Sequence, residues 1–373
     1  MPKQVAIIGA GWAGSSAARA LLDAGLGVEV FESAQVIGGH SRTELLQGVV
    51  YEPNGPHIFH SENERAVRWA RRFGLRRRFD FQPKTRIEID GEERLLCWPL
   101  RRDEVATLPE WPRIARELAE RPSHPDAASF ESWCVSLLGE TLYRLFVHGY
   151  TVKQWGCEPR LLSSSFAPKR IDFRETGRRG LFLDRWQYFP ARGVNRVIEA
   201  MLQPVAVHLG ARITLPDLDA PAFDRFDQIV VTAPLDDFAG PEAQGRLAWR
   251  GMRVVARFHD TADVADTHTP AYVINEPRLD VPYTRTVESK HATGQRIRGT
   301  VVCEEYPGAP ARHYPVHTAD AIYERENQRL KDFIRRASRR PVTFCGRLAN
   351  YRYINQDQAI LEGLRVVDDL LAD

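Results

Sequence analysis

Gly9-Ala10-Gly11-Trp12-Ala13-Gly14 decides the fold of this chain, because the six residues match the G-x-G-x-x-G pattern of a dinucleotide-binding turn. The flanking sequence makes the match informative. The apolar run 5–8 before it is typical of a buried parallel strand, and residues 15–24 favour a helix that Gly25 would end. A second apolar run at 28–31 completes a strand–helix–strand unit. We therefore expect an α/β chain with a Rossmann-like nucleotide-binding domain.

The residues around this turn predict that the dinucleotide is FAD. Gly9, Gly11 and Gly14 would let backbone amides and a helix N-terminus approach a pyrophosphate. Glu32 ends the second strand, where its carboxylate would accept hydrogen bonds from a ribose and repel the 2′-phosphate of NADP. The second glycine turn, Gly38-Gly39, is similar to one in flavoproteins with two dinucleotide-binding domains, where it contacts the FAD pyrophosphate. NAD dehydrogenases lack that turn, so FAD is favoured over NAD.

Composition excludes several other classes of protein. The 373 residues are 43% hydrophobic and 27% charged, which argues against a disordered chain. A net charge of +2 provides no general attraction for nucleic acid, and no apolar run approaches the roughly 20 residues of a membrane span. The five cysteines are scattered without metal-ligand spacing. We expect a reduced, cytoplasmic protein with no metal site.

The pattern beyond residue 32 predicts that the nucleotide-binding domain is interrupted. Asp90-Gly91 is typical of a hairpin turn, helical spacing dominates residues 109–150, and short β-branched runs alternate with turns over 248–306. An α/β pattern returns at the end of the chain. We predict a discontinuous FAD-binding domain, an inserted helical domain and an antiparallel β-sheet substrate domain, at residues 1–75, 192–235 and 314–373; 100–152; and 76–99, 153–191 and 236–313, respectively.

Six further motifs occur in order over nearly the whole chain. The most specific is the octapeptide 149–156, Gly-Tyr-Thr-Val-Lys-Gln-Trp-Gly. The other five are Gly55-Pro56-His57-Ile58-Phe59-His60, Val281-Pro282-Tyr283-Thr284-Arg285, Glu305-Tyr306-Pro307, Tyr314-Pro315-Val316 and Gly346-Arg347-Leu348-Ala349 with Tyr351 and Tyr353. Together they resemble the motifs of one family, UDP-galactopyranose mutase, whose octapeptide is Gly-Tyr-Thr-x-Lys-Gln-Trp-Gly.

Several side chains in these motifs, together with Arg170, have the chemistry to bind a nucleoside diphosphate. Arg170 and Arg285 carry forked guanidinium groups, Tyr314 and Tyr353 offer hydroxyl donors, and Tyr150 offers a ring on which a base could stack. Each has a plainer interpretation. Arg170 could be a solvated charge and the tyrosines could belong to the core. The same holds for His57, His60 and Trp155, which could all be structural.

The resemblance implies an isomerase that interconverts the pyranose and furanose forms of a nucleotide sugar, foremost UDP-galactopyranose and UDP-galactofuranose. It implies that N5 of reduced FAD attacks the anomeric carbon and forms a flavin–sugar adduct. The roles that it implies are catalysis for His57, Arg170 and Arg285; cofactor binding for Gly9, Gly11, Gly14, Glu32, Gly38, Gly39, His40, Arg347 and Asn355; and substrate binding for His60, Tyr150, Thr151, Trp155, Asn275, Tyr314 and Tyr353.

The sequence departs from the family near the expected sugar and base. Lys84, Arg86 and Arg179 replace neutral residues, and Leu181 replaces a tyrosine, which predicts a more positive pocket with one fewer hydroxyl donor. The alternative is that the basic residues face solvent. A different nucleotide sugar, GDP-linked or differently substituted, therefore stays open as substrate. An amine-oxidase-like oxidoreductase and a non-catalytic binding protein are the other readings, and a homodimer is possible on the sequence alone.

Overall fold

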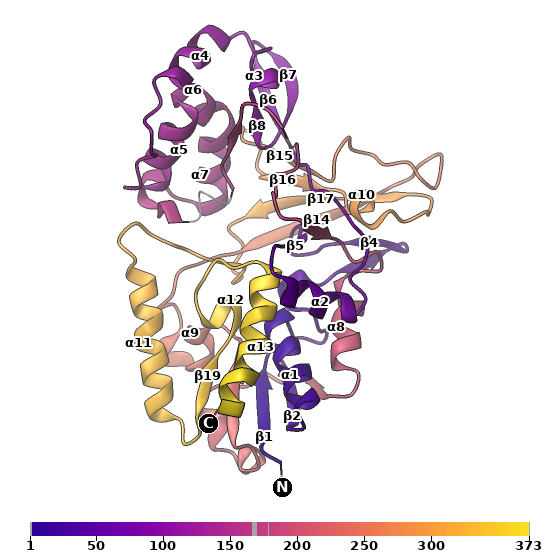
Figure 1. The fold of residues 1–373 in the computed structure, drawn as a ribbon, viewed down its shortest axis with the longest axis vertical. Coiled ribbons are helices and arrows are strands. Elements are labelled where there is room, and N and C mark those ends of the chain that lie inside the picture. Colours follow the sequence, from indigo (N-terminus) through magenta and orange to yellow (C-terminus); the bar gives the residue numbers. More distant parts are fainter. Residues whose placement is uncertain (1, 166–169, 178, 373) are drawn as a thin grey trace.

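The computed structural model describes residues 2–165, 170–177 and 179–372 of the chain. Figure 1 shows three parts, which are a parallel sheet flanked by helices near both termini, a second sheet beside it and a group of helices at the far end. The chain passes between the first two parts several times. Three two-stranded sheets, β5–β10, β13–β18 and β8–β9, pair strands from different predicted domains, and the division into domains stays a prediction.

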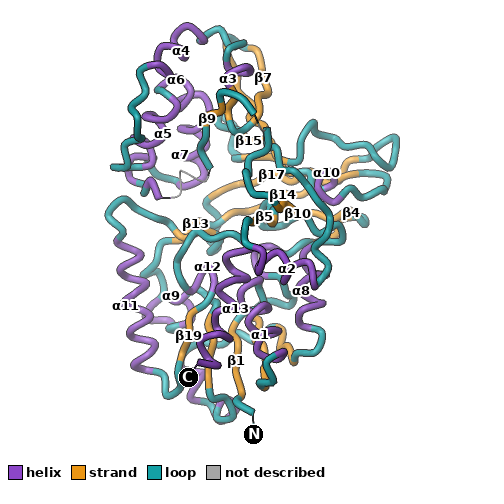
Figure 2. The backbone as a smooth tube through the Cα atoms, viewed as in Figure 1, coloured by secondary structure: helices purple, strands orange, loops and turns teal. Residues whose placement is uncertain are grey.

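The parallel sheet is the predicted Rossmann-like unit. Its order is β11-β2-β1-β12-β19, and all four neighbouring pairs are parallel. Alternate side chains of the central strand enter different cores, as the two-residue period of a strand requires. Val5 and Ile7 pack with side chains of α1 and α13, whereas Ala6 and Ile8 pack with side chains of α11. Figure 2 shows these helices beside the parallel sheet. The elements are β1(Gln4–Ile8), α1(Trp12–Asp23), β2(Gly27–Glu32), α2(Glu64–Arg72), α8(Val194–Leu202), β11(Ala206–Leu209), β12(Gln228–Val231), α9(Leu235–Phe238), α11(Ile322–Ala337), β19(Val342–Phe344), α12(Gly346–Ala349) and α13(Gln356–Ala372).

The second sheet has six strands in the order β14-β17-β16-β15-β6-β7. It is antiparallel as predicted except at one pair, since β15 and β6 run parallel. The exception arises because β6 comes from a separate segment, and the predicted Asp90-Gly91 turn joins it to β7 with positive φ at both residues. The strands are β6(Lys84–Ile89), β7(Glu92–Cys97), β14(Met252–His259), β15(Val273–Asn275), β16(Arg285–Val287) and β17(Thr300–Pro307).

The helical part packs against the β6–β7 hairpin. Ile87, Ile89 and Leu96 of the hairpin enter the core of this part together with buried side chains of its helices. Ser129 begins α5 with a capping box to Ser132, which fixes where that helix starts. The helices are α3(Arg102–Val105), α4(Trp111–Ala119), α5(Phe130–Leu138), α6(Glu140–Leu142), the π-helical segment η2(Tyr143–His148) and α7(Gly149–Trp155).

Short ribbons and turns join the two sheets and bring chemistry-bearing residues between them. β5 pairs with β10 and β13 pairs with β18, so that His60 and Tyr314 lie where the two sheets approach each other. These remaining elements are β3(Glu44–Leu46), β4(Val49–Tyr51), β5(Phe59–Ser61), β8(Leu100–Arg101), β9(Phe173–Arg174), β10(Trp186–Tyr188), β13(Trp249–Arg250), α10(Lys290–Thr293) and β18(Tyr314–Pro315).

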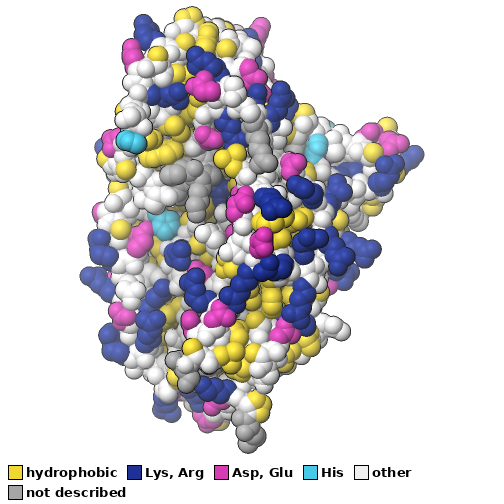
Figure 3. Space-filling view, in the orientation of Figure 1, with side chains coloured by type: hydrophobic (Ala, Val, Ile, Leu, Met, Phe, Trp, Pro, Cys, Tyr) yellow, Lys and Arg dark blue, Asp and Glu magenta, His cyan; other side chains and the backbone are white. Residues whose placement is uncertain are grey.

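The surface carries both signs of charge. In Figure 3, Lys and Arg side chains are interspersed with Asp and Glu on the face that is drawn. Among the residues that the structure describes, no helix is long and apolar enough to cross a membrane.

Candidate active site

A groove lies over the glycine turn between β1 and α1, and we call it the dinucleotide groove. All nine residues predicted to bind the cofactor line it: Gly9, Gly11, Gly14, Glu32, Gly38, Gly39, His40, Arg347 and Asn355. The second glycine turn is fastened to the first, since the amide of Gly38 donates to the carbonyl of Ala10 at 2.9 Å.

The groove fits an extended dinucleotide. Gly9 has φ +108°, and a Cβ on Gly14 would lie 2.0 Å from the carbonyl oxygen of Gly9, so the turn tolerates only glycine there. The carboxylate of Glu32 accepts the amides of Ala10 and Ala34 at 2.8 and 2.9 Å, which orients it and leaves lone pairs for a ribose. The buried indole N–H of Trp12, another residue of the groove, has no hydrogen-bond partner in the described part of the chain.

A second cavity opens where the helical part meets the six-stranded sheet, and we call it the substrate cavity. It shares His57, Arg347, Asn355 and Gln356 with the dinucleotide groove, so the two spaces meet at those residues. Nine of the ten residues predicted for catalysis or substrate binding line it: His57, His60, Tyr150, Trp155, Arg170, Asn275, Arg285, Tyr314 and Tyr353.

One wall of the substrate cavity is cationic and phenolic. Tyr314 and Tyr353 stack with ring centroids 6.1 Å apart, and the Arg170 and Arg347 guanidinium groups lie 5.4 and 5.0 Å from the Tyr353 ring. Arg170 also donates to Asn355 Oδ1 at 3.1 Å. Burial would raise the pKa of Tyr353, but the three nearby arginines outweigh it and hold that pKa below its ordinary value. The wall therefore has the positive potential that an anion needs.

Arg285 is held in this wall by a buried carboxylate. Its Nε donates to Glu305, which is 0% exposed and lies directly across the β16–β17 ladder. Burial lowers the pKa of the Arg285 guanidinium, but the adjacent Glu305 carboxylate outweighs burial and raises it, so Arg285 stays charged. Glu305 was not among the predicted site residues, although it begins one of the family motifs.

The His57 imidazole is neutral, because burial and the nearby positive charge of Arg347 disfavour its protonated form. Its Nδ1 lies 2.6 Å from the carbonyl of Gly55, so Nδ1 carries the proton and Nε2 is left as an acceptor. Burial and then Arg347 lower the pKa of His57 to about 3. The loop is anchored by Glu52, which accepts the His57 amide at 2.8 Å; burial raises the pKa of Glu52 to about 7. No motif in the sequence pointed to Glu52.

Of two other predicted substrate-binding residues, His60 lines the cavity and Thr151 does not. His60 stacks on Phe182 at 3.5 Å, and its Nδ1 lies 2.8 Å from Asp184, which fixes the ring. The structure does not bring Thr151 to the cavity, because its hydroxyl donates to the Val147 carbonyl one turn earlier in the helix.

The predicted gain of positive charge in the cavity is wrong. Lys84, Arg86 and Arg179 do not line it; Arg86 faces Glu93 on the neighbouring strand at 3.8 Å and Arg179 is exposed. The strand period explains this, since Lys84 and Arg86 point away from the face on which buried Thr85 lies. Leu181, by contrast, does line the cavity, and the loss of a hydroxyl donor relative to the family stays a prediction.

Sequence reasoning also missed most of the apolar lining and two polar residues, Gln154 and Gln356. Gln154 lies one turn after Tyr150 on the same face of α7, and its buried Oε1 has no partner among the described residues. Helical spacing from Tyr150 could have identified it. The apolar lining comes from distant segments and includes Phe81, Pro83, Trp98, Phe130, Phe146, Val147, Ile171, Leu181 and Phe182. Within residues 2–165, 170–177 and 179–372, no group of three His, Cys, Asp or Glu side chains could hold a metal ion.

The fold and the two joined spaces define a Rossmann-type dinucleotide-binding enzyme with a second cavity for an anionic ligand. A profile of the NAD(P)-binding Rossmann-like domain matches residues 7–73, and that of UDP-galactopyranose mutase matches residues 145–353. The chain therefore belongs to the UDP-galactopyranose mutase family. It is an isomerase with FAD as its cofactor, as predicted, and nucleotide-sugar pyranose mutases are its relatives.

Individual relatives support the same assignment over the full length. The chain is 27% identical to dTDP-fucopyranose mutase of Escherichia coli, with 97% of this chain and 96% of that protein covered. It is 28% identical to the "Probable UDP-galactopyranose mutase" of Klebsiella pneumoniae, with 99% and 95% covered. A crystal structure of reduced UDP-galactopyranose mutase has the same fold, with a TM-score of 0.76, 16% identity and coverage of 100% and 94%.

Proposed function

We propose that the protein interconverts the pyranose and furanose forms of a nucleotide sugar, with UDP-galactopyranose and UDP-galactofuranose as the first candidate pair. One observation carries the proposal. Arg170, Arg285 and Arg347 converge with tyrosine hydroxyls on a cavity that meets the dinucleotide groove at His57. A redox enzyme for an amine has no use for three cations at that junction.

The cationic wall would hold the diphosphate of the substrate. Arginine forks match phosphate oxygens in pairs, and the tyrosine hydroxyls donate to the same atoms. When the bond between the anomeric carbon and the diphosphate breaks, negative charge grows on the leaving oxygen. Arg285, fixed beforehand by Glu305, would stabilise that charge without rearranging. The arginines would also keep the diphosphate close for the return step.

FAD, when bound in its reduced form, supplies a nucleophilic nitrogen, N5, for the anomeric carbon. The remaining tasks belong to the chain. Neutral His57 adds no charge beside the reacting atoms, and its free Nε2 can accept a hydrogen bond. Phe81, Phe182 and the other apolar residues of the lining exclude water, which would otherwise hydrolyse an activated sugar.

A second candidate substrate is dTDP-fucopyranose, the substrate named for one relative. The observation that favours it is Leu181, an apolar side chain in the lining where the family has a tyrosine. A site without a hydroxyl donor discriminates weakly in favour of a substrate hydroxyl, and fucose lacks the 6-hydroxyl of galactose. The thymine methyl group also suits an apolar wall.

A panel of nucleotide sugars tests the proposal. Dithionite-reduced enzyme is incubated with UDP-galactose, dTDP-fucose, UDP-arabinopyranose and GDP-linked sugars, and products are separated by chromatography. We expect ring-contracted product from at least one of the first two. Leu181→Tyr should shift kcat/KM toward UDP-galactose, and Leu183→Tyr, at an exposed neighbouring position, is the control. Oxygen consumption without a furanose product would favour the amine-oxidase-like alternative.

A further inference from the structure

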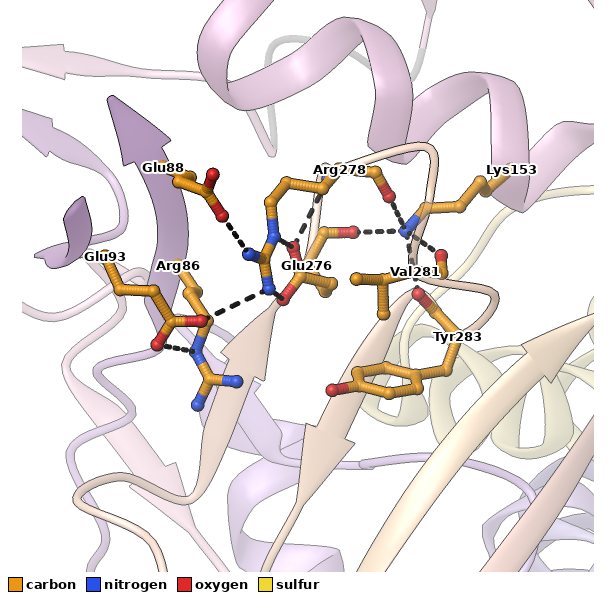
Figure 4. Close-up of polar contacts among 8 residues, drawn as sticks. All are labelled: Arg86, Glu88, Glu93, Lys153, Glu276, Arg278, Val281 and Tyr283. Atoms are coloured by element: carbon orange, nitrogen blue, oxygen red, sulfur yellow. Dashed lines mark hydrogen bonds and ion pairs between the residues drawn. The ribbon is translucent and has the colours of Figure 1, made fainter. Parts of the chain in front are cut away.

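Lys153 lies outside both cavities, and its ammonium is surrounded by backbone carbonyls. Its ammonium donates to the carbonyl oxygens of Glu276 and Arg278 at 2.7 Å, Val281 at 2.9 Å and Tyr283 at 2.8 Å. We call these four acceptors the carbonyl cage (Figure 4). An ammonium has three N–H donors, so four acceptors at these distances saturate it.

The carbonyl cage belongs to the loop 276–284, which joins two strands that both contribute to the substrate cavity. Asn275 ends β15, Arg285 begins β16, and the two residues lie opposite each other in the ladder. The loop supplies no side chain to the cavity lining. What it controls is the spacing and tilt of the strand ends that carry Asn275 and Arg285.

Lys153 itself lies on α7, the helix that carries Tyr150, Gln154 and Trp155 into the cavity. The helix and the loop are also in backbone contact, because a Cβ on Gly149 would lie 2.1 Å from the carbonyl oxygen of Pro277. One ammonium therefore joins the two sides of the cavity that would hold the nucleotide.

A different residue, Arg278, holds the loop to the β6–β7 hairpin. Arg278 pairs with buried Glu276 within the loop and with Glu88 and Glu93 on the β6–β7 hairpin, at 2.8, 2.8 and 3.4 Å (Figure 4). The hairpin carboxylates are about half exposed, so those pairs contribute little on their own. The Lys153 ammonium, by contrast, is partly buried, and burial lowers its pKa to about 8, against the opposing effect of Glu276 and Asp280.

We propose that Lys153 is a positioning residue for nucleotide-diphosphate binding. By filling the carbonyl cage, its ammonium holds α7 and the loop 276–284 in the one arrangement in which Tyr150 and Arg285 act on the same ligand. The inference rests on the proposed function for the identity of that ligand.

The test compares two lysines of the holoenzyme whose ammonium groups are held by backbone carbonyls. Lys290 is the matched control, since its ammonium donates to three carbonyls, of Asp266, Ile297 and Gly299, at 2.8 to 2.9 Å, and none of these residues lines the cavity. Lys153→Met and Lys290→Met each remove a carbonyl-bound ammonium. We expect the Kd of UDP or dTDP to rise roughly tenfold or more in Lys153→Met alone, with FAD content unchanged in both variants.

Chemical rescue separates the missing ammonium from general damage. Lys153→Ala lacks three methylene groups and the ammonium, so propylammonium replaces what was removed, and propan-1-ol serves as the uncharged control. We expect propylammonium, and not propanol, to restore nucleotide binding. The inference is overturned if Lys153→Met binds within twofold of wild type, if Lys290→Met weakens binding equally, or if propylammonium restores nothing. Failure of the wild-type protein to bind either nucleotide would instead contradict the proposed function.

Discussion

Replacing Arg285 with methionine removes a guanidinium charge that we propose binds the diphosphate of the substrate. Two effects of different origin should follow. The Glu305 carboxylate, 0% exposed, loses its partner, and breaking a buried ion pair costs about 3–5 kcal/mol of stability. Separately, a lost charge-assisted contact to the diphosphate costs about 2–5 kcal/mol of binding. At about 1.4 kcal/mol per decade, this second effect is roughly 30-fold to a few thousand-fold in Kd.

A double variant separates the two effects. Arg285→Met with Glu305→Gln leaves no buried charge, so its stability should return toward wild type while nucleotide binding stays lost. Urea unfolding measures the first quantity and titration calorimetry with UDP and dTDP the second, on protein with its FAD content checked by absorbance. Recovery of nucleotide binding in the double variant would instead show that Arg285 serves only to neutralise Glu305 and does not bind the diphosphate.

Three further outcomes are expected. Arg170→Ala should lower kcat/KM more than tenfold with normal FAD content, and Arg170→Lys should recover little of it because lysine lacks the fork; near-wild-type steady-state kinetics would remove Arg170 from the site. Gly14→Ala should purify without flavin absorbance, because its Cβ would lie 2.0 Å from the Gly9 carbonyl oxygen; full FAD occupancy would mean that the turn adapts. Burial raises the pKa of Glu52 from its ordinary 4.5 to about 7, so between these values the folded protein keeps a proton that the unfolded chain has released. Stability should therefore fall as pH rises through that window, and urea midpoints should depend less on pH in Glu52→Gln.

The nucleotide-binding half could be predicted because its signals are local. The strand, the glycine turn, the helix and Glu32 all lie within the first 32 residues, and each reflects a requirement of backbone geometry. That both ends of the chain contribute to one sheet follows from the α/β pattern at each end, whereas the order of the strands was not predicted. Gly9, Gly11, Gly14 and Glu32 come from these local signals, and the other five cofactor residues of the dinucleotide groove came from resemblance to known families.

The substrate cavity could be predicted only as a set of residues, not as a set of contacts. The pairing of Arg285 with Glu305 depends on the register of β16 against β17. The orientation of Lys84 and Arg86 depends on which face of β6 is covered, and a pattern of residue types does not give that. Thr151 was predicted to bind substrate because it belongs to a specific motif, but its hydroxyl donates to a carbonyl of its own helical segment instead.

The central claim is that this FAD-containing enzyme rearranges a sugar ring without net oxidation. The direct measurement follows furanose formation from UDP-galactopyranose and dTDP-fucopyranose by the same enzyme sample, first oxidised, then reduced with dithionite, then reoxidised in air. We expect product only in the reduced sample, many turnovers per reducing equivalent, and loss of activity on reoxidation. Equal turnover by the oxidised enzyme, or consumption of one reductant per product, would contradict it.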